Sequence, residues 1–230
     1  MVITIDGPAG SGKSTAARNL ARSLGIAYLD TGATYRAVTL KALREGVDLS
    51  DEAALADAAR RAEIHLRPHE GGTGVLLDGE DVTEAVRSER VSEMSYYVAR
   101  SRRVREVLVE LQRKVGAELG SFVSEGRDQG SVVFADADVK FYLVADPSAR
   151  AQRRCAELRA RGEACDEDEV RAALERRDRR DRSRTVGPLV KPDGAVVVDT
   201  TGRDIDATTS TLLEHVRRRL GRDDERGARP

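Results

Sequence analysis

Short apolar runs alternate along the chain with longer stretches in which apolar residues recur every three or four positions. The runs predict buried strands and the longer stretches predict helices. The predicted strands span 2–5, 26–29, 122–124, 139–144 and 195–199. The predicted helices span 13–24, 30–43, 50–62, 91–119 with a break near 101, 147–161, 166–184 and 205–220. This alternation predicts an α/β fold, with a parallel sheet covered by helices on both faces.

One stretch departs from this order. Residues 64–67 alternate between apolar and polar, a Gly-rich turn follows, and 75–82 resume an extended pattern. This predicts a small antiparallel hairpin, inserted as a flap at 63–87 between core segments 1–62 and 88–220. Residues 221–230 are charged and aperiodic, so we expect a disordered tail.

Composition agrees with one α/β domain carrying an insertion: 230 residues, 40% of them hydrophobic. The net charge of -1, from 39 basic and 40 acidic residues, provides no overall field toward nucleic acid or a membrane. No apolar run approaches the ~20 residues of a membrane span, and the first strand leaves no room for a signal peptide. We therefore expect a cytoplasmic protein, with Cys155 and Cys165 as free thiols in a reducing compartment.

The first strand leads into a glycine-rich loop with the spacing G-x-x-x-x-G-K-S. This spacing is typical of a loop that wraps the phosphates of a nucleotide, with Lys13 reaching the β and γ groups and Ser14 placed to bind Mg²⁺. The N-terminal dipole of the following helix favours the same anion. The alternative is a Gly-rich turn with a solvated lysine. The predicted ATP-binding residues are Gly7, Pro8, Ala9, Gly10, Ser11, Gly12, Lys13, Ser14 and Thr15.

Arginines at strand ends and helix starts indicate a second anion facing the γ-phosphate. They are Arg36, Arg127, Arg177 and Arg184. An acceptor phosphate monoester is mostly ionised at pH 7, since its second pKa is about 6, and it needs no general base. Catalysis then reduces to alignment and charge neutralisation. The chain shows no Ser-His-Asp or Cys-His set that would point to other chemistry.

Five motifs together resemble the bacterial cytidylate kinases. They are Ile-Asp-Gly-Pro-x-Gly-x-Gly-Lys-Ser at 5–14, Leu-Asp-Thr-Gly-Ala-x-Tyr-Arg at 29–36, Gly-Glu-Asp-Val at 79–82, Gly-Arg-Asp-x-Gly at 126–130 and Arg-Asp-x-x-Asp-Arg-x-Arg at 177–184. The resemblance implies a P-loop kinase that uses MgATP to phosphorylate CMP and dCMP. It also implies a monomer with a nucleotide-binding flap and a mobile lid, which we place at about 150–167.

The resemblance also implies roles for single residues. It assigns the acceptor phosphate to Arg36, Arg127 and Arg184, the ribose to Arg177 and Asp181, and cytosine to Arg105 and Asp128. It adds Thr31 and Tyr35 to the substrate site and, by analogy with other lids, places Arg153 and Arg154 on the transferring phosphate. Tyr96 stands where the family usually has a serine near the cytosine amino group, and Gln129 where a large apolar residue is usual.

The cytosine assignment agrees with the chemistry of the base. Cytosine presents an amino donor beside two acceptors, which a carboxylate and a guanidinium complement, whereas uracil would face Asp128 with a carbonyl group.

Three other interpretations stay open. The first is a P-loop kinase for UMP, AMP or a small hydroxyl metabolite, the last needing Asp128 or Asp30 as a base. The second is a nucleic-acid-binding helix at 171–184, although acidic residues interrupt its basic face and it has no interleaved aromatics. The third is a nucleotide-binding regulator without catalysis. For the kinase that the resemblance implies, we expect neither a nucleic-acid nor a membrane partner.

Overall fold

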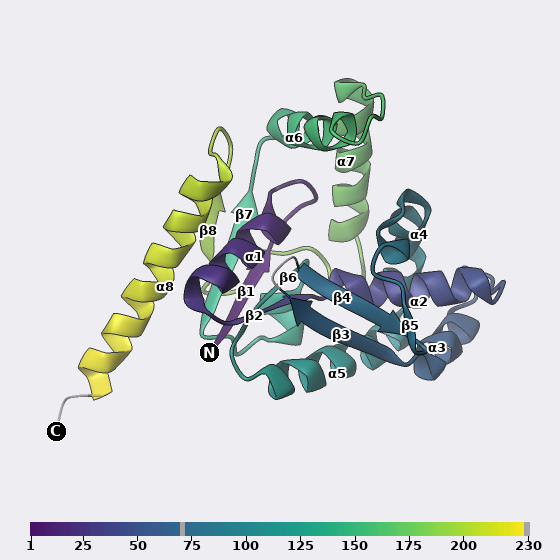
Figure 1. Cartoon of the computed structure of the whole chain (residues 1–230), viewed down its shortest axis with the longest axis horizontal. Helices are drawn as coiled ribbons and strands as arrows, with labels where there is room; N and C mark the ends of the chain where they lie inside the picture. The colour runs from purple at the N-terminus through teal and green to yellow at the C-terminus, as the bar shows by residue number, and fades with distance from the viewer. Residues whose placement is uncertain (70–71, 228–230) are drawn as a thin grey trace.

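A computed structural model, which describes residues 1–69 and 72–227, places the strands of the core in one five-stranded sheet (Figure 1). All neighbouring strands run parallel, in the order β2-β6-β1-β7-β8. Their bounds are β1 Val2–Asp6, β2 Ala27–Asp30, β6 Phe122–Gly126, β7 Val139–Val144 and β8 Val196–Asp199. Because β1 lies in the middle, the glycine-rich loop at its carboxyl end is flanked by the ends of β6 and β7.

Helices cover both faces of this sheet (Figure 1). On one face, α1 (Lys13–Leu24) and α8 (Ile205–Gly227) share a core with β1 and β7, which includes Leu20, Phe141 and Leu212. On the other face, α5 (Arg102–Leu119) packs against a cluster formed by Leu29, Phe122, Val133 and Phe134. The predicted fold class is therefore confirmed.

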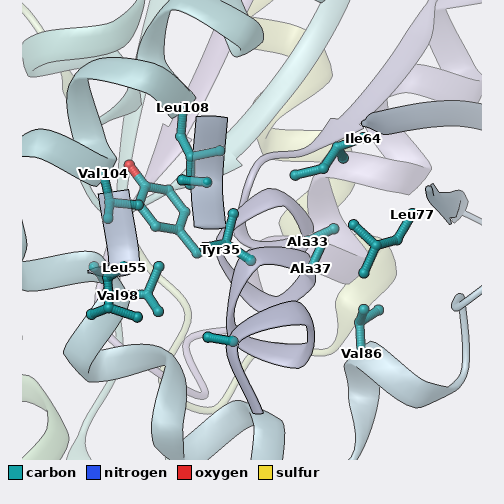
Figure 2. Close-up of a cluster of buried hydrophobic side chains, with 14 of the residues drawn as sticks. Ala33, Tyr35, Ala37, Leu55, Ile64, Leu77, Val86, Val98, Val104 and Leu108 are labelled. Carbon is teal, nitrogen blue, oxygen red and sulfur yellow. The ribbon is translucent and has the colours of Figure 1, made fainter. Parts of the chain in front are cut away.

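A second core lies beside the sheet. It joins α5 to α2 (Gly32–Arg44), α3 (Glu52–Arg61), α4 (Glu89–Arg100) and the short helix η1 (Ala85–Arg87). Figure 2 shows Tyr35 of α2 in this cluster, near Val104 and Leu108.

The predicted hairpin is present as part of a small antiparallel sheet. Strands β3 (Ile64–His69), β4 (Gly72–Leu77) and β5 (Glu80–Asp81) pair in chain order, with Ile64 opposite Leu77. Ile64 and Leu77 are buried in the second core (Figure 2). The division into a core and a nucleotide-binding flap at 63–87 stays a prediction.

Two further helices, α6 (Pro147–Arg159) and α7 (Glu167–Arg182), stand beyond the carboxyl edge of the large sheet and pack on each other (Figure 1). The prediction of free thiols here is wrong, because Cys155 of α6 forms a disulfide with Cys165 just before α7. The chain reverses at Gly162, whose φ is 78°, and this turn brings the two cysteines to a Cα separation of 5.5 Å.

The C-terminal prediction also needs correction. We expected the last helix to end near Leu220 and 221–230 to be disordered, but α8 continues to Gly227, so the expectation is wrong for 221–227. Arginine and glutamate are good helix formers, so a helix can persist after its apolar periodicity stops. Residues 228–230 lie outside the described ones. Within the described ranges, none of the helices combines the length and apolarity needed to cross a bilayer.

Candidate active site

The donor side of the site is the loop between β1 and α1. Gly7, Gly10 and Gly12 have φ angles of 149°, 74° and 83°, which residues with a Cβ rarely adopt. At Gly7 a Cβ would lie 2.2 Å from the carbonyl oxygen of Leu143, so only glycine fits there. The loop therefore passes close to β7 and presents its backbone N–H groups at the start of α1, as an anion site requires.

Lys13, the first residue of α1, folds over this loop and is buried. Its Nζ donates to the carbonyl oxygen of Pro8 at 2.7 Å, and Ser11 Oγ donates to the same oxygen at 3.0 Å. Burial lowers the pKa of Lys13, and the guanidinium of Arg127 lowers it further. A bound triphosphate would oppose both effects, so the loop holds a cation that gains from an anionic ligand.

Ser14 faces a carboxylate that sequence reasoning missed. Its Oγ donates to Glu125 Oε1 at 2.8 Å, and the hydroxyl of Tyr28 lies 3.4 Å from the same oxygen. Glu125 is buried near the carboxyl end of β6, the strand beside β1. A hydroxyl and a carboxylate are hard oxygen ligands, so this pair fits Mg²⁺. The available signal was a glutamate directly before the Gly-Arg-Asp motif.

The acceptor side is a cavity of about 360 Å³ next to the loop. Residues of the glycine-rich loop and of α1, α2, α4, α5, β6, α6 and α7 line it, so segments far apart in the sequence meet there. The predicted substrate residues that line it are Thr31, Tyr35, Arg36, Arg105, Arg127, Asp128, Arg177, Asp181 and Arg184. The cavity thus collects every predicted substrate residue except Tyr96.

Two carboxylates hold the arginines that are predicted to bind the acceptor phosphate. Asp30 accepts from Arg36 Nη2 at 2.8 Å. Asp181 accepts from Arg127 Nε at 2.8 Å and also from Arg184. Burial would raise the pKa of Asp181, but the surrounding guanidinium groups hold it below its usual value. These pairs fix the arginines in place before any substrate binds.

Positive charge nevertheless exceeds negative charge at this wall of the cavity. Arg177 makes no ion pair with any residue that the structure describes. The protein packed around it lowers the pKa of Arg177, and so does repulsion from Arg127. Because Arg127 also lowers the pKa of Lys13, the cationic groups of the donor and acceptor sides repel each other. Anions bound between them would relieve this repulsion.

The floor of the acceptor cavity holds a buried ion pair, in which Arg105 donates to Asp128. Burial raises the pKa of Asp128, although Arg105 opposes the shift. The backbone that follows Asp128 is held by Asp6, whose carboxylate accepts the N–H groups of Gln129 and Gly130 at 2.8 and 2.7 Å. Burial raises the pKa of Asp6 to about 6.

Gln129, the unusual residue of this motif, is satisfied within the protein. Its side-chain oxygen accepts from Ser124 Oγ at 2.8 Å, and it is 1% exposed. The polar side chain therefore adds a hydrogen bond beneath the cavity.

Tyr96 lies outside the acceptor cavity in this structure, whereas its neighbour Ser95 lines it. The ring of Tyr96 faces a second space between α4 and α7, where the guanidinium of Arg180 lies 4.9 Å from its centroid. Successive residues of a helix point about 100° apart, so a shift of one position decides which side chain meets the substrate. A cytosine contact by Tyr96 stays a prediction that this geometry does not favour.

The donor side opens into a larger cleft of about 570 Å³ between the loop, α6 and the start of α8. Both predicted lid arginines line it, but only Arg154 also reaches the acceptor cavity. Arg153 instead donates from Nη1 to Thr200 Oγ1 at 3.0 Å. The lining adds Thr200, Arg203 and Thr208, which sequence reasoning did not identify.

The chain is similar to known proteins along most of its length. Residues 3–219 match the cytidylate kinase family. The cytidylate kinase of Symbiobacterium thermophilum is 48% identical over 95% of this chain and 96% of its own length. That of Rhodococcus opacus is 47% identical, over 96% of each chain.

Solved structures with little sequence similarity share the fold. An uncharacterized protein from Eubacterium ventriosum aligns over 94% of this chain and 97% of its own, with a TM-score of 0.53 at 15% identity. A Thermus thermophilus protein aligns over 96% and 97%, with a TM-score of 0.51 at 20% identity.

Proposed function

The chain belongs to the cytidylate kinase family, and on that premise we propose how its cleft transfers the γ-phosphoryl group of ATP to CMP or dCMP. ATP occupies the donor cleft and the monophosphate occupies the acceptor cavity. The cationic side chains that line both spaces are those of Lys13, Arg36, Arg154 and Arg177. The γ-phosphoryl group therefore lies where these four side chains meet.

On the donor side, the backbone N–H groups of the glycine-rich loop bind the phosphates and Lys13 neutralises their charge. Ser14 and Glu125 would hold Mg²⁺, for which their oxygens are suitable ligands. The bound ion would supply positive charge that offsets the charge of the transferring phosphate. Tyr28 keeps Glu125 oriented through its hydroxyl.

On the acceptor side, Arg36, Arg127 and Arg184 bind the monophosphate. Their present partners are Asp30 and Asp181, each of which leaves guanidinium N–H groups free for phosphate oxygens. Arg177 and Asp181, which both lie on α7, bind the ribose next to the phosphate.

The observation that carries the proposal is the uncompensated positive charge between the two spaces. Burial lowers the pKa of both Lys13 and Arg177, and repulsion from Arg127 lowers each further, so both sides of the site gain from bound anions. Two phosphate groups supply that charge. The acceptor oxygen is already ionised, so the transfer needs alignment and no proton acceptor.

The base is read by Arg105 and Asp128, which are paired with each other in the structure. Cytosine inserts at this pair, so that Asp128 accepts from the exocyclic amino group and Arg105 donates to the ring acceptors. Thr31, Tyr35 and Ser95 line the cavity around it.

A hydroxyl acceptor is less suited to this cavity. Its two candidate bases, Asp30 and Asp128, are each engaged by an arginine. The arginines of 171–184 alternate with buried Asp178 and Asp181, which does not favour a nucleic-acid face. Since one chain lines both spaces, we also propose that the protein acts as a monomer. A cytoplasmic location stays a prediction.

An acceptor panel tests the proposal. Steady-state rates with CMP, dCMP, UMP and AMP at saturating MgATP should give kcat/KM values for CMP and dCMP about 100-fold above those for the others. That gap follows from the charges of Arg105 and Asp128, which the wrong base leaves unpaired. Equal rates with UMP or AMP would contradict the base-reading role, and phosphorylation of a hydroxyl metabolite alone would replace the proposal.

A further inference from the structure

A buried ring of hydrogen bonds joins Ala9 of the glycine-rich loop to both α6 and α7. The N–H of Ala9 donates to Asp178 Oδ1 at 3.1 Å, and the carbonyl oxygen of Ala9 accepts from Arg150 Nη1 at 2.9 Å. The same Nη1 donates to Asp178 Oδ2 at 2.6 Å, which closes the ring. We call these three residues the Ala9 clamp. They are 5%, 4% and 2% exposed for Ala9, Arg150 and Asp178.

The clamp buries a charged pair between the loop and the two helices. A buried arginine and carboxylate lose hydration, and replacing such a pair with apolar side chains is often neutral or stabilising. The charged pair adds orientation, because both backbone polar groups of Ala9 are satisfied only in one orientation of the two helices. This favours a role in placement over a role in stability alone.

The clamp acts on a helix that carries part of the acceptor site. Asp178 follows Arg177 directly, and Asp181 lies one turn further along α7, where it holds Arg127 and Arg184. Fixing Asp178 against Ala9 therefore sets both the rotation of α7 and its distance from the glycine-rich loop.

Helix α6, which carries Arg150, packs closely against the glycine-rich loop as well. A Cβ added to Gly10 would lie 3.2 Å from Cβ of Arg150, so α6 meets the loop without space for a larger residue.

We propose that Arg150 and Asp178 are positioning residues that hold the acceptor arginines in register with the donor phosphates. The inference rests on the proposed function and adds to it. In-line transfer depends on the relative placement of two phosphates, and a displacement of about 1 Å can cost a factor of about 100 in rate. The side chains of Arg150 and Asp178 line neither the acceptor cavity nor the donor cleft, so their effect falls on kcat more than on binding.

The decisive variant replaces both charges, Arg150→Met with Asp178→Leu. Apolar side chains leave no buried charge unpaired, but the N–H and carbonyl groups of Ala9 lose their partners, so we expect a folded protein with a lowered melting temperature. We expect kcat with CMP to fall about 100-fold, while KM for ATP and CMP changes less than about fivefold, because the binding groups themselves remain. A purely structural pair would change melting temperature and leave kcat per folded molecule intact.

A single substitution provides a second, milder test. Asp178→Asn keeps an oxygen for the N–H of Ala9 but removes the charge that holds Arg150, so we expect kcat to fall about tenfold. The matched control is Asp168→Asn, the same change on the same helix in an exposed pair with Arg171. It should leave kcat within about twofold.

Each outcome decides the matter. A folded double variant with kcat within about threefold of the wild type overturns the inference. If the double variant does not fold, Asp178→Asn decides, and a kcat per folded molecule equal to that of Asp168→Asn overturns it. A wild-type protein that does not phosphorylate CMP would instead overturn the proposed function.

Discussion

The donor half of the cleft is formed mainly by backbone groups, whereas the acceptor half is formed by side chains. The donor half is a single loop, 7–12, whose backbone groups and glycine conformations form the site, with Lys13 held on a carbonyl oxygen of that loop. The acceptor half is made of side chains from separate elements, and each predicted phosphate arginine is held by a carboxylate. One half is thus set by chain conformation and the other by charge balance.

This difference determines how each half responds to substitution. Backbone N–H groups cannot be removed singly without changing the loop, so the donor half depends on few side chains. The acceptor half divides its work among groups that bind phosphate, ribose and base, so each can be removed with a separate consequence. Three substitutions, from the largest expected effect to the smallest, test this contrast.

The largest effect is expected from Lys13→Met. It removes the one buried side-chain cation of the loop while keeping a flexible apolar chain, so we expect kcat to fall about 10³-fold, equally with CMP and dCMP. A coupled assay for ADP formation measures it. Lys114→Met, an exposed lysine on α5, is the control and should stay within about twofold. A loss below about tenfold would mean that backbone groups suffice on the donor side.

An intermediate effect confined to the acceptor half is expected from Asp128→Ala. It removes the acceptor for the cytosine amino group and leaves Arg105 buried without its partner, so kcat/KM for CMP should fall about 100-fold. KM for ATP, measured at saturating CMP, should change less than about threefold. Asp136→Ala, an exposed aspartate before β7, is the control. Equal losses for both nucleotides would break the contrast between the halves.

The smallest effect is expected from Tyr96→Phe, which marks the border of the acceptor half. Because Tyr96 faces Arg180 and not the cavity, loss of its hydroxyl should change kcat/KM for CMP less than about twofold. Ser95→Ala, one residue away and lining the cavity, should cost about threefold or more. The reverse order would return the cytosine contact to Tyr96.

The same contrast explains what the sequence could predict. The donor loop is contiguous, so its spacing identifies it, and the predicted first helix, 13–24, matches α1. The sequence did not reveal the role of Glu125, because that role depends on strand pairing. Strand β6 lies beside β1, and this places the Glu125 carboxylate against Ser14. The choice between Ser95 and Tyr96 escaped because it depends on the rotation of α4.

The other feature that the sequence did not reveal is how the chain turns between the predicted helices 147–161 and 166–184. Ten residues of continuous helix span about 15 Å, which would hold Cys155 and Cys165 well apart. The turn at Gly162 removes that separation, and no feature of the cysteine spacing indicates it. The hairpin and the parallel sheet were predictable, because periodicity reports which positions are buried.

Because of the disulfide between Cys155 and Cys165, the protein can exist in an oxidised and a reduced form. It ties the end of α6 to the start of α7 across a separation of 10 residues. A covalent ring of that size removes unfolded-chain entropy equivalent to roughly 2.5 kcal/mol. A preparation kept in a thiol reductant and one kept without it therefore differ by a covalent bond between α6 and the start of α7, and rate constants should be measured on each.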